Sequence, residues 1–317
     1  MSSTSNDNGR AYEYACLQAL YEAIRKYRVV QIIKNSSLVV SQLAWDRLSI
    51  QQQEIYTLSA SSICSTIFAL EPNILEQGED ILEIYIQGDR EGEKADVRDI
   101  IIKRNNIVWE IGLSIKHNHL AIKHSRIART LDFGAKWYGV PCSNSYWEEI
   151  KPVFDFLEAE KRKGTLFSEL EAKDTQIYLP LLTAFIKELE KQVKGNREVA
   201  KRLVEYLLSK YDFYKVISHD EQRITTIQSF NMYGTLNLPS SQIKPTIKVQ
   251  RVNMPQNILY IGLKLSSAST VLLVFDNGWQ FSFRIHNASR IVEPSLKFDI
   301  RIEGVPAELN IKYHCNW

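Results

Sequence analysis

The segment from Glu93 to Asn118 limits the possible folds of this chain more than any other stretch. Its first half carries two aspartates, Asp96 and Asp99, into an isoleucine-rich run, and after a polar pair at residues 105–106 a second apolar run ends near Lys116. β-branched residues favour strands, and paired asparagines favour turns. The pattern therefore predicts two antiparallel strands that bring a carboxylate and an amine close together.

A two-residue turn at residues 105–106 sets the expected register of this hairpin. The opposed pairs are then Asp99 with Gly112, Val97 with Ser114 and Ala95 with Lys116. Directly opposed residues share one face of a sheet. One face is therefore predicted to carry Asp99, Glu110, Ser114 and Lys116, and the other to carry Asp96, although a bulge or a one-residue slip would reverse this. Asp99 is the first candidate for a metal ligand and Asp96 the second.

A carboxylate and a lysine on neighbouring strands suit the hydrolysis of phosphodiester bonds. The carboxylate can bind Mg²⁺, and the lysine can lie near the attacking water and the scissile phosphate. The same residue types also occur on ordinary solvated strands. Their spacing alone therefore does not distinguish a catalytic site from a polar surface.

The composition is that of a soluble globular protein. Hydrophobic residues make up 44% of the 317 residues and charged residues 24%. No apolar run approaches the ~18 residues that a membrane helix needs, and the polar N-terminus lacks the apolar core of a signal peptide, so we expect a cytoplasmic protein. The four cysteines are too scattered for a zinc site or a disulfide framework and are predicted to be buried free thiols.

Two regions with different residue patterns follow a polar tail. Residues 1–9 are predicted to be disordered. Residues 10–212 combine helical periodicity with the hairpin, whereas residues 213–317 favour short strands. The expected fold is therefore α/β (α+β), with a mixed sheet flanked by helices, a β-rich C-terminal region and a boundary near residue 212. The helices expected are Arg10–Arg28, Val40–Leu70, Leu120–Leu131, Trp147–Lys163, Ile177–Val193 and Glu198–Tyr211, and the strands include Ile81–Gln87, Thr246–Val252 and Trp279–Ile285.

Positive charge is concentrated directly after the hairpin. The net charge is only +2, but residues 111–131 contain no acidic residue. On a helix over Leu120–Leu131, Lys123, Arg126 and Arg129 recur every three residues and would be neighbours. These side chains are candidates for contacts with DNA phosphates, although a solvated helix face has the same pattern.

The predicted strand Trp279–Ile285 carries groups that can contact base edges. Gln280, Arg284 and His286 fall on one face of the strand, and Asn287 follows it. Amide side chains suit adenine, and arginine suits the O6 and N7 atoms of guanine. An ordinary half-buried antiparallel strand would show the same alternation.

The hairpin resembles the active site of the PD-(D/E)xK nuclease superfamily. There an aspartate precedes an apolar strand, here Asp99 before three isoleucines, and the next strand ends with an acidic residue, one spacer and lysine. Ser114 stands where the acidic residue is usual, so a second carboxylate must come from elsewhere. Glu110 lies roughly 13 Å from Ser114 at ~3.3 Å per residue, which is too far. Many members carry a helical glutamate beside the site, and Glu13 is the matching candidate.

Longer stretches resemble the HaeIII-like family of type II restriction endonucleases. They are ADVRDIII (95–102), EIGLSIKHNHLAIKHSR (110–126), LDFGAKW (131–137), SFNMYGTLN (229–237), DNGWQFSFRIHNA (276–288) and VEPSLKFDI (292–300). The resemblance implies a Mg²⁺-dependent enzyme that cuts double-stranded DNA at a short palindrome, GGCC for the family, to leave blunt ends. It also implies a methyltransferase that protects host DNA, and the palindrome suggests a homodimer.

The resemblance also implies roles for individual residues. Asp99 or Asp96, together with Glu13, would bind Mg²⁺, and Lys116 would orient or help to deprotonate the attacking water and stabilise charge on the phosphorane. Ser114 would support a water bound to the metal. Two other functions remain open, namely a repair or junction-resolving nuclease of the same superfamily and a non-catalytic DNA-binding protein in which Ser114 marks a decayed site.

Overall fold

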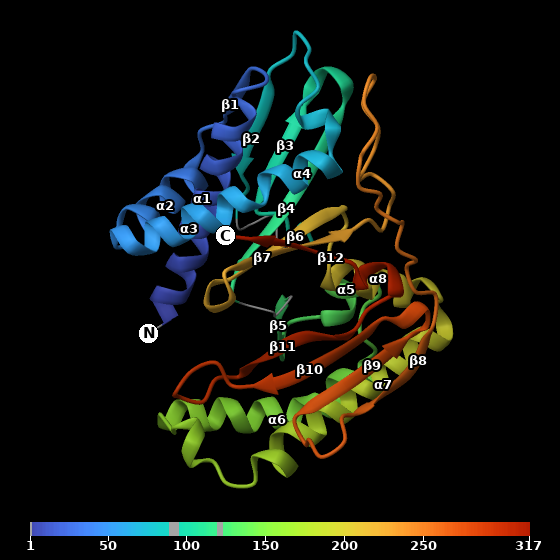
Figure 1. The fold of residues 1–317 in the computed structure, drawn as a ribbon. Helices are drawn as coiled ribbons and strands as arrows, with labels where there is room; N and C mark the ends of the chain where they lie inside the picture. Colours follow the sequence, from blue (N-terminus) through green and yellow to red (C-terminus); the bar gives the residue numbers. More distant parts are fainter. Residues whose placement is uncertain (1, 89–94, 119–122) are drawn as a thin grey trace. The chain divides into compact units, whose positions relative to one another are not determined.

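The computed structural model describes residues 2–88, 95–118 and 123–317 (Figure 1). The chain divides into two compact units, each built from separate stretches. Unit 1 comprises residues 1–120, 209–252 and 307–317, and unit 2 comprises residues 121–208 and 253–306. This division differs from the single boundary expected near residue 212, because the strands at 213–219, 224–230 and 312–316 join the sheet of unit 1 whereas the strand at 123–128 joins the sheet of unit 2.

Unit 1 is organised around a seven-stranded mixed sheet of order β1-β2-β3-β4-β6-β7-β12. β1 is parallel to β2 and β4 is parallel to β6, whereas the other neighbouring pairs are antiparallel. The expected α/β fold with a mixed sheet is confirmed. The strands are β1 (Val30–Ile32), β2 (Leu82–Ile86), β3 (Ile100–Arg104), β4 (Trp109–His117), β6 (Phe213–His219), β7 (Ile224–Phe230) and β12 (Lys312–Asn316).

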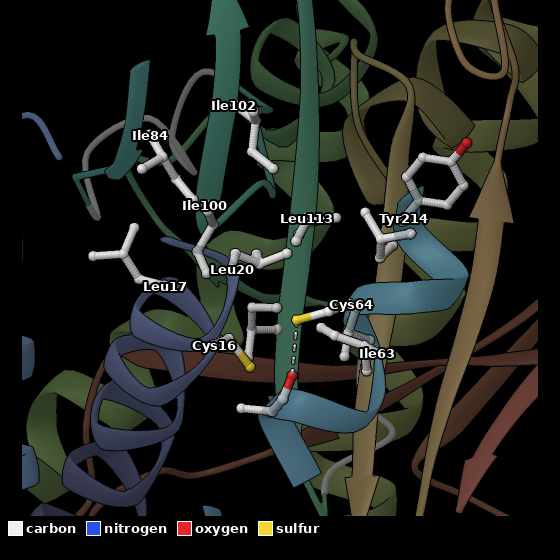
Figure 2. Close-up of a cluster of buried hydrophobic side chains, with 14 of the residues drawn as sticks. Cys16, Leu17, Leu20, Ile63, Cys64, Ile84, Ile100, Ile102, Leu113 and Tyr214 are labelled. Carbon is white, nitrogen blue, oxygen red and sulfur yellow. Dashed lines mark hydrogen bonds between the residues drawn. The ribbon is translucent and has the colours of Figure 1, made fainter. Parts of the chain in front are cut away.

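Helices cover the apolar face of this sheet. They are α1 (Ser2–Ile24), α2 (Ser36–Asp46), α3 (Ile50–Ser62) and α4 (Cys64–Leu70). Figure 2 shows Leu17 and Leu20 of α1 in one buried cluster with Ile100 of β3, Leu113 of β4 and Tyr214 of β6. Because side chains alternate along each strand, residues one position away from these point to the opposite face of the sheet.

The loop of the hairpin is longer than predicted. Arg104 pairs with Trp109, so residues 105–108 connect β3 to β4 and the predicted two-residue turn is wrong. The register therefore differs by two residues and brings Asp99 beside Ser114. Because the difference is an even number of residues, the predicted shared face of Asp99, Glu110, Ser114 and Lys116 is preserved. The predicted place of Asp96 on the opposite face is wrong, because Asp96 lies outside β3 and shares Arg98 with Glu110.

The start of β3 also differs from the prediction. Ala95 lies in a turn with a φ of 63°, and β3 begins only at Ile100. Ala95 and Val97 therefore do not pair with β4, and the expected opposition of Ala95 and Lys116 is wrong. The chain turns here because the backbone carbonyl of Ala95 accepts a hydrogen bond from Lys210 N at 2.9 Å, a partner far away in the sequence.

Unit 2 contains a five-stranded antiparallel sheet of order β5-β11-β10-β9-β8. Its apolar face is covered by helices, with Phe185 of α7 packed on Phe283 and Phe298 at ring-centroid distances of 5.8 and 5.2 Å. The strands are β5 (Lys123–Ala128), β8 (Ile258–Leu263), β9 (Thr270–Phe275), β10 (Gln280–His286) and β11 (Ser295–Gly304). The helices are α5 (Phe133–Tyr138), α6 (Asn144–Lys163), α7 (Leu179–Gly195) and α8 (Glu198–Leu207).

The predicted basic helix over Leu120–Leu131 is wrong. Lys123–Ala128 form β5, which pairs with β11, and part of the predicted helix, residues 120–122, lies outside the described residues. Ser125 and Ile127 are buried whereas Arg126 between them is exposed, which is the alternation of a strand. The helical spacing of Arg126 and Arg129 therefore does not exist. The strand partner that overrides the local pattern lies far along the chain.

Of the remaining predictions, those for the N-terminal tail and for one strand differ from the structure, and that for the cysteines agrees with it. Residues 2–9, for which disorder is predicted, form the first turns of α1, and Asp7 there pairs with Arg47 at 3.0 Å. The predicted strand Thr246–Val252 is wrong, because this segment makes isolated backbone hydrogen bonds with Ala69 and Asn231 rather than a ladder. All four cysteines are buried and free, as predicted. Within the described residues, every helix is too short or too polar to cross a membrane.

Candidate active site

Asp99 and Lys116 meet at the end of the β3–β4 hairpin that lies opposite its connecting loop. The Lys116 Nζ atom lies 2.9 Å from Oδ2 of Asp99, and the side chains of both residues are about a quarter exposed. Lys116 is close to the C-terminal end of β4, and Asp99 immediately precedes β3. The predicted convergence of a carboxylate and an amine is therefore confirmed, and the pair is open to solvent.

The Asp99 carboxylate is held by β4 as well as by Lys116. Its Oδ2 atom accepts a hydrogen bond from the backbone N–H of Ile115 at 2.6 Å and from the Ser114 hydroxyl at 3.4 Å. The backbone N–H of Asp99 also donates to the Leu113 carbonyl at 2.8 Å. These contacts orient the carboxylate before any ligand binds. Within the described residues no hydrogen bond reaches the Oδ1 atom of Asp99, so this atom is available for a metal ion.

Electrostatics keep Lys116 protonated. Burial lowers the pKa of Lys116, but the charge and hydrogen bond of Asp99 and the charge of Glu13 outweigh that effect and raise the pKa above its ordinary value. Lys116 is therefore an ammonium group at neutral pH. In this arrangement it can donate hydrogen bonds and stabilise negative charge, whereas it does not accept a proton.

Glu13 is the second carboxylate near this pair. It lies on α1, and its charge reaches Lys116 strongly enough to affect the lysine pKa. The adjacent Tyr12 is fully buried and hydrogen-bonded to the Ser59 hydroxyl at 2.7 Å, which anchors this part of α1. Within the described residues, no three His, Cys, Asp or Glu side chains gather into a metal cluster. The site therefore offers two carboxylates, from Asp99 and Glu13, and a lysine.

Asp96 and Glu110 are committed to another contact. The Arg98 guanidinium makes a bidentate pair with Asp96, with both N–O distances at 2.8 Å, and also binds Glu110 at 2.8 Å. Asp96 and Arg98 are buried. A Cβ atom on Gly112 would lie only 2.0 Å from Cδ of Arg98, so only glycine fits at that position of β4. The structure thus brings Asp99, and not Asp96, beside Lys116.

A polar network that the sequence pattern did not indicate supports the end of β4. Nε2 of His117 lies 2.6 Å from Oδ2 of Asp220, and Nδ1 of His117 lies 3.3 Å from the Tyr56 hydroxyl. Burial raises the pKa of Asp220, but hydrogen bonds with His117 and Ser218 outweigh it and lower that pKa. The network ties β4 to α3 and to the turn after β6, which positions the residue next to Lys116.

Three of the four candidate base-contacting residues lie on β10 of unit 2, and Asn287 follows that strand. Phe281, Phe283 and Ile285 are buried, which confirms the predicted apolar face of this strand, although Ser282 on the polar face is also buried. Arg284 is half exposed, and its guanidinium lies 3.6 Å from Asp299 on β11. Gln280 and His286 share its face of the strand.

The structure adds one candidate to this face and weakens another. Arg301 on β11, which the sequence analysis did not single out, lies 3.4 Å from the same Asp299 and adds a second arginine beside Arg284. The Asn287 amide donates to the carbonyls of Ser289 and Ile291 at 2.6 and 2.9 Å, so its donors hold a loop. The alternation of Lys297, Asp299 and Arg301 was the sequence signal for the added arginine.

The basic residues after the hairpin are spread over a strand and a turn. Lys123 lies at the start of β5, where its backbone pairs with Ile300. Arg126 lies 3.5 Å from Glu293, and Arg129 pairs with Asp155. Both arginines remain about half exposed.

Comparisons with known proteins identify the family of this chain. A family model described as HaeIII restriction endonuclease matches residues 9–306. The type II restriction enzyme HaeIII of Haemophilus aegyptius is 50% identical over 310 residues, which cover 98% of this chain and 97% of that protein. This chain belongs to the HaeIII restriction endonuclease family. No solved structure matches it.

Membership of the HaeIII family decides between the activities left open by the sequence. The protein is a type II restriction endonuclease, a hydrolase of a restriction–modification system that acts on DNA. Enzymes of this type depend on a divalent metal, and carboxylates such as those of Asp99 and Glu13 are the kind of oxygen donor that such an ion prefers.

Proposed function

We propose that Asp99, Glu13 and Lys116 form a Mg²⁺-dependent site that hydrolyses a phosphodiester bond of double-stranded DNA. The observation that carries this proposal is the contact between Lys116 and an Asp99 carboxylate already oriented by β4, at 2.9 Å. Mg²⁺ in proteins is usually held by one or two carboxylates plus waters and substrate phosphates. Two carboxylates and no cluster of nitrogen or sulfur ligands in the described part of the chain fit that preference.

The residues have distinct roles in this proposal. Asp99 and Glu13 hold the metal, which when bound activates a water and polarises the phosphate. The Lys116 ammonium orients the attacking water and stabilises the negative charge that develops on the phosphorane. The raised pKa of Lys116 favours this role over proton abstraction. Ser114 steadies Asp99 through its hydroxyl and is open to support a water of the metal.

Asp99 is preferred to Asp96 as the metal ligand. Asp96 is buried and neutralised by a bidentate contact with Arg98, so binding a metal there would require breaking a buried ion pair. Such a disruption costs about 3–5 kcal/mol. Asp99 needs no comparable rearrangement because its side chain is partly exposed.

The target proposed for this enzyme is GGCC, cut in the middle to leave blunt ends. Arg284 with Arg301, Gln280 and His286 lie on one face of unit 2, and arginine suits guanine O6 and N7. Asn287 is a weaker candidate because its amide donors are engaged in a loop. Lys123, Arg126 and Arg129 are proposed to contact the DNA backbone. A homodimer would match the two-fold symmetry of the palindrome, and a cognate methyltransferase would protect host DNA.

Digestion of a sequenced plasmid tests this function. We expect discrete fragments with Mg²⁺, no cleavage with EDTA, and blunt ends that map to the centre of GGCC. Plasmid methylated at GGCC is the matched control and should resist cleavage. A smear of products would contradict a demanding target sequence, and discrete fragments ending elsewhere would refute GGCC while leaving the chemistry intact.

A further inference from the structure

A second lysine lies on the same sheet face as the proposed site. Lys215 of β6 is the register partner of Ser114 on the parallel strand β4. Register partners point to the same side of a sheet, and residues two apart on one strand also share a side. Lys215 is therefore on the side that carries Asp99, Ser114 and Lys116, one strand away from Ser114.

Lys215 has no counter-charge in the described part of the chain. It is buried, and the charged groups that act on its pKa are Lys116 of β4 and Lys312 of β12, both positive. The neighbour on β7 is the neutral Gln228. Burial and then the two lysine charges lower the pKa of Lys215 to about 8. By contrast, Lys103 on the same face pairs with Glu83 at 3.0 Å.

A buried ammonium group without an anion is costly, so its retention beside a nuclease site calls for an anionic ligand. The residue at position 114 bears directly on this. A carboxylate there would face Lys215 across the strand pair and would neutralise it, whereas the serine that is present leaves Lys215 unpaired. The absence of an acidic residue at position 114 therefore explains why Lys215 has no counter-charge on β4.

We propose that Lys215 is a catalytic residue that binds a non-bridging oxygen of the scissile phosphate, next to Lys116. The proposal rests on the proposed function and adds a residue to it. The phosphodiester anion supplies the negative charge that no described residue of the protein provides to Lys215. The lysine keeps its proton throughout, and it stabilises the charge that grows on the phosphorane.

Substitutions at Lys215 test its contribution to the chemical step. Lys215→Met keeps the apolar stem and removes the charge, and its single-turnover cleavage rate should fall by about 10²–10³-fold, the loss seen when one charge-stabilising donor is removed. Lys103→Met is the matched control, because it makes the same change on the same sheet face, and its rate should stay close to that of the unmodified enzyme. The fold of each variant is checked by circular dichroism and thermal unfolding.

The pH dependence of DNA binding provides a readout that a structural role would not move. With Ca²⁺ in place of Mg²⁺, the affinity of the unmodified enzyme for a cognate duplex should fall between pH 7 and 9 as free Lys215 loses its proton. Lys215→Arg should abolish this contribution, because arginine stays protonated throughout that range. This variant also serves if Lys215→Met does not fold.

The outcomes separate the two proposals. Folded Lys215→Met that cuts at the unmodified rate, or Lys215→Arg with an unchanged fall in affinity, would overturn the role of Lys215. An inactive Lys215→Arg whose parent gains activity as pH rises through 8 would also overturn it, because that pattern belongs to a proton acceptor. Retained cleavage by Lys116→Met would instead overturn the proposed function itself.

Discussion

Lys116→Met tests the proposed site most directly, because methionine retains an unbranched apolar side chain and removes only the ammonium group. The structure gives this group one carboxylate contact, at 2.9 Å from Asp99, and an exposed fraction of 27%. In the proposed mechanism this group stabilises the phosphorane, and its partly exposed ion pair contributes little to the fold. The change should therefore affect the transition state far more than the folded protein.

The expected magnitude follows from these contacts. Loss of one charge-stabilising donor lowers a rate by about 10²–10³-fold, or roughly 3–4 kcal/mol of activation free energy. The free energy of unfolding should fall by only about 1 kcal/mol, because the ion pair is partly exposed and Asp99 keeps its hydrogen bond from Ile115 N–H. The Kd for cognate DNA with Ca²⁺ should change by no more than about fivefold, which corresponds to about 1 kcal/mol.

Single-turnover cleavage of a labelled duplex measures the chemical step without interference from product release. Lys103→Met, whose lysine pairs with Glu83 on the same face, should cleave at the unmodified rate. Urea unfolding and a Ca²⁺ binding titration complete the set. A Lys116→Met enzyme that cleaves within tenfold of the unmodified rate would refute the reasoning.

Three further predictions address the carboxylates and the buried charges of unit 1. Asp99→Asn should abolish Mg²⁺-dependent cleavage in a folded protein, whereas Asp96→Asn should lower the free energy of unfolding by about 3–5 kcal/mol in urea titrations; an inactive but fully stable Asp96→Asn would reverse this assignment. Burial raises the pKa of Glu71 from 4.5 to about 7 despite hydrogen bonds from Tyr214 and Asn237. The unfolded chain therefore releases this proton at a lower pH than the folded protein does. The free energy of unfolding should fall by about 3 kcal/mol as pH rises from about 4.5 to above 7. Glu71→Gln should flatten this part of the stability profile in urea titrations at several pH values, and an unchanged slope would count against it. Arg104→Met should lower the free energy of unfolding by about 3–5 kcal/mol at neutral pH. The reason is that the guanidinium groups of Arg104 and a neighbouring arginine lower the pKa of Asp80 to about 2. Stability from the lowered pKa is present above the ordinary carboxyl range and is lost as pH falls toward 2, so the cost in urea titrations should shrink at pH 3, and an equal cost at both pH values would contradict the ion-pair account.

Local patterns in the sequence determined the parts of this protein that depend on neighbours along the chain. The period-two alternation of β10 predicted its polar and apolar faces. The two apolar runs of β3 and β4 predicted a hairpin that brings a carboxylate and an amine together, with Asp99 as the first candidate. The prediction that Asp99 and Lys116 share a sheet face held although the predicted loop length was wrong, because the register changed by two residues and not by one.

Tertiary structure decided what depends on distant partners. β5 is a strand because it pairs with β11, although its own residues suggested a helix. Asp96 is neutralised because Arg98 folds back over Gly112, and no spacing rule indicates which of two aspartates an arginine will take. Lys215 lies next to Ser114 on the sheet face of the proposed site only because β6 pairs with β4 as a parallel neighbour, almost a hundred residues along the chain. Parallel pairing requires a long crossover, so the residues that it brings together leave no local pattern in the sequence.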